Sequence, residues 1–100
     1  MITKEQIIKK LELRREKIRS FGVKKLMLVG SYAQDKANKN SDIDFVVEFK
    51  TGRGLFDDFI HLNHFLEDLF HHKIDLIEKD LIREELKEYI LGGEKLEAKV

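Results

Sequence analysis

Residues 42–49 alternate between apolar and mainly acidic side chains, and this period of two constrains the fold more than any other feature. Successive side chains of an extended strand point to opposite faces, so a strand here has one apolar face and one acidic face. The apolar face must be buried, while Asp42 and Asp44 project together from the other face with Cα atoms roughly 7 Å apart. The residues of the apolar face are Ile43, Phe45, Val47 and Phe49. Val46 and Glu48 lie on the same face as the two aspartates.

The rest of the chain predicts two more strands and four helices around this one. The strands are expected at 25–29 and 73–78, where short apolar or alternating runs occur. Helical periodicity predicts helices at 4–21, 55–70 and 81–91, and a shorter helix is expected at 31–37. The last helix is expected to turn Ile82, Leu86, Tyr89 and Ile90 inward, and residues 94–100 either fray or add an edge strand.

This element order, α-β-α-β-α-β-α, predicts one domain over residues 1–100 with an α/β (α+β) fold, in which a small mixed sheet packs on helices. The chain has no cysteine, which excludes disulfides and zinc fingers. Its longest apolar run is residues 26–29, so we expect no membrane span, no export and a cytoplasmic location.

The formal net charge is zero, which argues against broad binding to nucleic acid. The charge is nevertheless uneven, because residues 1–25 hold nine basic against three acidic side chains, whereas residues 42–100 hold eight against fifteen. Such an asymmetry raises the question of what the acidic residues are gathered for.

Three features of the sequence together indicate phosphate chemistry. Gly30 and Ser31 lie between a buried strand and a helix, where a close backbone and free N–H groups can bind a phosphate. Asp42 and Asp44 share a strand face and suit a hard cation such as Mg²⁺, although the same face is also compatible with simple exposure to water. Asp75 is a lone acid in an apolar strand and joins the other two if the strands are neighbours.

Other residues allow two interpretations each. His61 and His64 have a spacing compatible with a metal, although exposed helix histidines are commoner, and His71 and His72 are expected to cap the same helix. The apolar stripe of helix 55–70 is wide, so it is either covered by the sheet and a neighbouring helix or used as an oligomer or partner interface.

The segments Gly30-Ser31-Tyr32-Ala33 and Ser41-Asp42-Ile43-Asp44-Phe45, followed by Asp75, resemble the minimal nucleotidyltransferases of the DNA polymerase β-like superfamily. The resemblance implies that Gly30 and Ser31 hold the β- and γ-phosphates of a nucleoside triphosphate. It implies that Asp42 and Asp44 bind two Mg²⁺ ions, and that Asp75 ligates one metal and helps to deprotonate the acceptor hydroxyl.

The same resemblance implies an antitoxin that transfers AMP from ATP to a tyrosine of a HEPN toxin partner. Where the family often has a basic residue and then glycine, this chain has Gln34 and Asp35. The acid opposes triphosphate binding unless Lys36 compensates, and it strains the turn unless Asp35 accepts a left-handed conformation. Two alternatives stay open, namely a binding module that neutralises its partner by docking through helix 55–70, and a nucleotidyltransferase for small molecules such as aminoglycosides.

Overall fold

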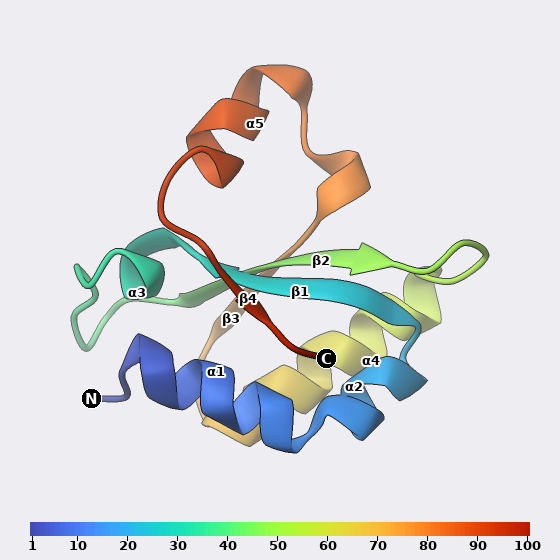
Figure 1. The fold of residues 1–100 in the computed structure, drawn as a ribbon, viewed down its shortest axis with the longest axis horizontal. Helices are drawn as coiled ribbons and strands as arrows, with labels where there is room; N and C mark the ends of the chain where they lie inside the picture. The colour runs from blue at the N-terminus through green and yellow to red at the C-terminus, as the bar shows by residue number, and fades with distance from the viewer.

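The centre of the protein is a four-stranded mixed sheet with the order β3-β2-β1-β4, seen in a computed structural model that describes residues 1–100 (Figure 1). Strand β1 is antiparallel to both β2 and β4, and β2 is parallel to β3. The mixed sheet is confirmed, and residues 94–100 add an edge strand. The strands are β1 Val23–Val29, β2 Ile43–Phe49, β3 Ile74–Glu78 and β4 Leu96–Ala98.

Helices lie on both faces of the sheet, but unequally (Figure 1). One face is covered by α1 (Lys4–Leu13), α2 (Arg15–Ser20) and α4 (Phe56–Phe70). The other face has only the 3₁₀ turn η1 (Lys79–Leu81) and α5 (Glu84–Leu91), while α3 (Gly30–Ala33) lies at one end of the sheet. Helix α4 makes the crossover that two parallel strands require. No helix has the length and apolar content needed to cross a membrane.

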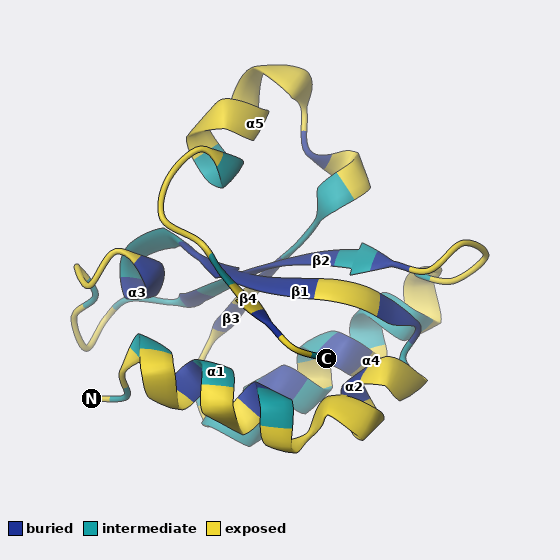
Figure 2. Cartoon of the chain, viewed as in Figure 1, coloured by how far each residue is buried: buried dark blue, intermediate teal, exposed yellow.

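The main core lies under the covered face, where the alternation of β2 is confirmed. Phe45 is fully buried there, as are Ile43 and Val47. They pack with buried residues of the surrounding helices, chiefly Ile7, Leu11, Ile18, Leu62 and Leu66. On the opposite face a smaller cluster of four residues, Met27, Val29, Val46 and Ile82, is buried, but Figure 2 shows α5 exposed along most of its length. We call this second face, which has the smaller core and the more exposed helix, the open face.

The first predicted helix is wrong in one respect, because the segment 4–21 is broken at Arg14, whose backbone leaves the helical region (φ −115°, ψ 22°). No glycine or proline marks the break. Leu11 and Ile18, on either side of it, are both fully buried, so the bend keeps both short helices on the core. The first helix begins with a capping box formed by Thr3 and Gln6.

The predicted helix at 31–37 is also shorter than expected, since α3 ends at Ala33. The N–H of Lys36 donates to the carbonyl of Ser31 (2.9 Å) and that of Asp35 to Tyr32 (3.4 Å), which is the Schellman pattern of a helix end. Asp35 has a φ of +58° and takes the left-handed position that glycine usually fills there. The sequence requires Asp35 to accept a left-handed conformation, and in the structure it does.

The inner stripe predicted for the last helix is wrong for two of its four residues, Leu86 and Tyr89. Helix α5 begins only at Glu84, so Ile82 is buried ahead of the helix rather than within it. Leu86 and Tyr89 are exposed, at 43% and 86%, because a hollow rather than packed side chains separates this part of α5 from the sheet. Ile90 is half-buried.

The wide stripe of α4 is largely covered, as one of its two interpretations expected. Leu62 and Leu66 are buried, and Phe59, Phe65, Leu69 and Phe70 pack partly buried against the core. Leu55 and Phe56, at the start of the helix, stay 75% and 77% exposed. A partner contact through this helix stays a prediction.

Candidate active site

Two of the three predicted aspartates lie side by side. Strands β2 and β3 run parallel with a register that pairs Asp44 with Asp75. Because their neighbours Phe45 and Leu76 belong to the main core, both carboxylates point to the open face of the sheet. Asp44 is half-buried and Asp75 is exposed. The expectation that strand three lies beside strand two and brings Asp75 to Asp44 is confirmed.

Asp42 directly precedes β2, and its carboxylate lies 3.8 Å from the Nζ atom of Lys73. Its charge still acts on Asp44, since it contributes to the raised pKa of that group. Asp42 therefore lies at the edge of the carboxylate pair, partly neutralised by a lysine.

Negative charge is concentrated around Asp44. Partial burial, followed by the charges of Asp75 and Asp42 and a hydrogen bond with Asp75, raises the pKa of the Asp44 carboxyl to about 6. Each of these causes disfavours the ionised form, and no basic side chain forms an ion pair with Asp44. A bound cation would reverse the balance, because positive charge favours both carboxylates in their ionised form.

The residues of this pair fit a Mg²⁺ ion. No group of three or more His, Cys, Asp or Glu side chains is arranged to hold a metal on its own. Mg²⁺, however, is usually held by one or two carboxylates together with water and substrate phosphates, and it does not need an all-protein cage. The pair Asp44 and Asp75, with Asp42 beside it, is a donor set of that kind. His61 and His64 are both exposed and belong to no such group.

The predicted phosphate turn meets the carboxylates directly. Strand β1 ends at Val29, which is paired with Asp44, and Gly30 follows with a φ of +73°. A Cβ atom on Gly30 would lie only 2.1 Å from Oδ2 of Asp44. The glycine is therefore needed twice, for its backbone conformation and for the approach of the carboxylate.

One cavity of about 650 Å³ contains this whole arrangement. Gly30, Ser31, Asp44 and Asp75 line it, so four of the five predicted site residues share one wall, and Asp42 lies outside the lining. The volume falls within the range of small-molecule sites. Five further residues of α5 and the loop after α3 also line it, namely Gln34, Lys36, Leu86, Tyr89 and Ile90, and Gly93 and Glu94 line it just beyond α5.

Asp35, Lys36 and Gln34, where the sequence departs from the pattern that it resembles, lie at or near the cavity. The carboxylate of Asp35 accepts a hydrogen bond from Nζ of Lys4 at 2.8 Å, so its charge is paired and directed to α1. Lys36 lines the cavity beside Ser31, as a substitute basic residue for a phosphate would. Gln34 also lies in the cavity wall, where a Cβ atom added to Gly93 would lie 3.6 Å from its Nε2 atom.

Sequence reasoning missed the role of His72. His71 does end α4, in the left-handed conformation (φ 49°). His72 instead contacts the carbonyl of Ser41 at 2.5 Å, and its ring meets that of Tyr32 edge-on at 6.0 Å. Since Ser41 directly precedes Asp42, His72 helps to fix the entry to β2. No local sequence pattern predicts this contact, because His72 and Ser41 are 31 positions apart in the chain.

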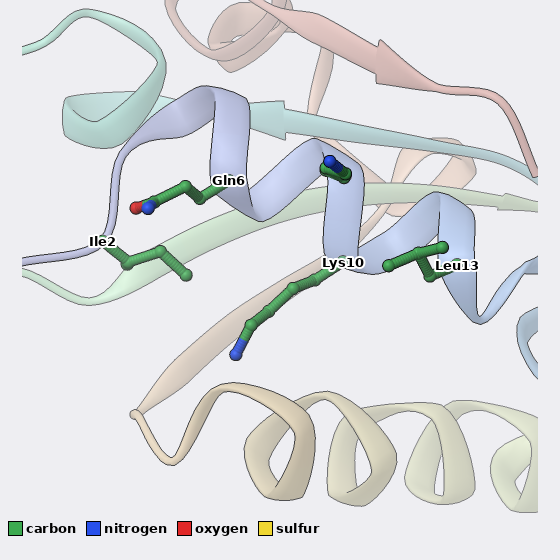
Figure 3. Close-up of a pocket in the computed structure, with 5 residues that line it drawn as sticks. Ile2, Gln6, Lys10 and Leu13 are labelled. Carbon is green, nitrogen blue, oxygen red and sulfur yellow. The ribbon is translucent and has the colours of Figure 1, made fainter.

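A second hollow, of about 330 Å³, lies on α1 and contains no acidic residue (Figure 3). Ile2, Gln6, Lys9, Lys10 and Leu13 line it. Figure 3 shows Lys10 reaching from α1 toward the neighbouring helix, where its Nζ lies 6.0 Å from the centre of the Phe70 ring. None of the residues predicted for the active site lines this hollow.

Comparison with known proteins agrees with this geometry. Residues 7–95 match the nucleotidyltransferase domain family. The protein adenylyltransferase MntA of Thermococcus cleftensis is 32% identical over 91% of this chain and 92% of its own length. A solved structure provisionally named a minimal nucleotidyltransferase is 30% identical, with a TM-score of 0.69 over 89% of this chain and 93% of its own.

A more distant structure has the same fold. It contains a tri-AMPylated HEPN toxin of Shewanella oneidensis in complex with an MNT antitoxin, and it matches with a TM-score of 0.63 at 17% identity, over 91% of this chain and 71% of that one. The cavity with its glycine turn and paired aspartates thus occurs in a chain that belongs to the nucleotidyltransferase domain family, among its minimal nucleotidyltransferases.

Proposed function

We propose that this chain is a Mg²⁺-dependent adenylyltransferase that moves AMP from ATP onto a hydroxyl of a protein partner. The observation that carries the proposal is the carboxylate pair Asp44 and Asp75, which shares one cavity with the Gly30 and Ser31 turn. Nucleotidyl transfer requires these two components next to each other, one for metal and one for phosphate.

The residues divide the work according to their positions. Gly30 and Ser31 would hold the β- and γ-phosphates through backbone N–H groups and the serine hydroxyl, with Lys36 adding positive charge from the same wall. Asp44 and Asp75, assisted by Asp42 at the edge of the site, would hold two Mg²⁺ ions. When bound, these ions supply charge neutralisation for the triphosphate and for the oxygens that enter and leave.

In the proposed reaction the acceptor oxygen forms a bond to the α-phosphorus while the bond from that phosphorus to the bridging oxygen of pyrophosphate breaks. Pyrophosphate leaves, and the hydroxyl proton passes to the carboxylate of Asp75. Asp75 suits this step because it is exposed, whereas Asp44 is half-buried. An acceptor entering from solution therefore meets Asp75 first.

A tyrosine of a HEPN-type toxin is the acceptor we propose, with the chain acting as antitoxin. Support comes from the relative named protein adenylyltransferase, and from the fold neighbour described as an MNT antitoxin beside an AMPylated HEPN toxin. Exposed Leu55 and Phe56 offer apolar surface for such a partner on α4.

The test is a transfer assay with the HEPN-type protein encoded by a neighbouring gene, Mg²⁺, and ATP labelled in either the α- or the γ-phosphate. We expect α-label but no γ-label on a tyrosine of the partner, and loss of labelling with Asp44→Asn or with chelator. Glu48→Gln is the matched control, because Glu48 lies on the same strand and face but pairs with Lys24 and Lys79 outside the cavity.

Labelling by Asp44→Asn at the wild-type rate would refute the proposed site. If neither variant nor wild type labels the partner while all of them neutralise it, the chain is a docking antitoxin and the enzymatic proposal is wrong.

A further inference from the structure

The wall of the cavity is divided into two chemically different parts. The sheet end carries the polar groups already assigned to phosphate and metal, namely Gly30, Ser31, Asp44 and Asp75. The helix end carries Leu86, Tyr89 and Ile90 of α5, with Gly93 and Glu94 just after the helix. A nucleoside triphosphate has the same division, with a charged phosphate chain at one end and a flat aromatic base at the other.

Leu86 and Tyr89 are large side chains of α5 that stay exposed to solvent. They lie three positions apart, so they are neighbours on one helix surface, and they are 43% and 86% exposed. Neither residue belongs to the small core on the open face of the sheet, which is made of Met27, Val29, Val46 and Ile82. The ring of Tyr89 therefore makes few contacts with its own chain and is free to pack against a ligand.

Because the ring lies on the cavity wall, a base can reach it while the phosphates stay at the glycine turn. Stacking of a base on an aromatic ring is favourable for every base, since each has a flat π-face. We propose that Tyr89, flanked by Leu86, forms the base-stacking platform of this site. The proposal rests on the proposed function and extends it, because it assigns the nucleoside end of the substrate to α5.

The experiment compares two ligands that differ only at this end. Titration calorimetry of the full chain with Mg-ATP and with Mg-tripolyphosphate separates binding of the base from binding of the phosphates. We expect Tyr89→Ala to weaken ATP binding roughly 5- to 150-fold, the range that loss of one base–aromatic stack implies, and to leave tripolyphosphate binding unchanged. Tyr89→Phe keeps the ring and should bind both ligands like wild type.

Leu81→Ala is the matched control. Leu81 is an apolar residue with similar exposure, 75%, in the η1 turn before α5, and it does not line the cavity. We expect this variant to bind both ligands like wild type. Retained tripolyphosphate binding by Tyr89→Ala also shows that the variant is folded.

Two results would overturn the stacking platform but not the proposed function. The first is equal ATP binding by wild type and Tyr89→Ala. The second is a loss of ATP affinity in Tyr89→Phe as large as in Tyr89→Ala, which would assign binding to the hydroxyl of Tyr89. Absence of binding of both ligands by wild type would instead contradict the proposed function itself, and the platform with it.

Discussion

Replacing Gly30 by alanine tests the close approach of the glycine turn to the carboxylate. At a φ of +73° an L-residue pays about 1–2 kcal/mol, and alanine recovers about 0.4–1 kcal/mol by stiffening the unfolded chain. The net backbone cost is therefore about 1 kcal/mol. In addition, the new Cβ would lie 2.1 Å from Oδ2 of Asp44, so the carboxylate must move by more than 1 Å to reach an ordinary contact of 3.4 Å or longer.

Displacement of a reacting group by about 1 Å costs on the order of 100-fold in rate. We therefore expect Gly30→Ala to lose about 1 kcal/mol of unfolding free energy in urea titration, and about 100-fold in the α-labelled ATP transfer assay. The clash changes activity much more than stability because the Asp44 side chain can rotate, whereas its function depends on where it points.

Gly52→Ala is the control that isolates the clash. Gly52 has nearly the same conformation, with a φ of +81°, and a Cβ there would meet nothing within 4 Å. We expect it to lose a similar amount of stability and no activity. If the two variants lose activity equally, or if Gly30→Ala keeps wild-type transfer, the argument that Gly30 makes room for Asp44 is refuted.

Three further outcomes follow from charges and backbone conformation. Without metal, Asp44→Asn should be more stable than wild type by no more than about 3 kcal/mol, because the raised pKa of Asp44, about 6, makes its ionised form costly in the folded state. Melts in the presence of chelator should show this difference in stability growing between pH 4 and 6. The hydrogen bond from Arg53, with the Gly54 N–H, lowers the pKa of Asp58 to about 2, so its stabilising charge is complete above pH 4 and lost as pH falls toward 2. Urea titrations should accordingly show Asp58→Asn less stable by about 1 kcal/mol at pH 6 and equal to wild type near pH 2. Asp35→Gly should raise the melting temperature, because relief of a φ of +58° gains about 1 kcal/mol and the exposed ion pair with Lys4 that is lost contributes little. An unchanged or lower melting temperature would contradict this expectation.

The sequence by itself determined the local features of the site. The alternation in 42–49 requires a strand with Asp44 on the face opposite Phe45, and the structure has it. The Gly30 and Ser31 turn follows from a short apolar run that ends in glycine. Such features depend on backbone geometry and on the period of the side chains, which neighbouring residues decide among themselves.

Only the tertiary structure decided how these parts meet. The parallel register that pairs Asp44 with Asp75, the contact of His72 with Ser41, and the break at Arg14 all join or respond to residues far apart in the chain. The same holds for α5, whose helical pattern predicted a packed face. Tyr89 lines a cavity instead, because the distance between helix and sheet depends on the loops that hold α5. Local periodicity determines which side of a helix is apolar, but only the assembled fold decides whether that side meets a core or a ligand.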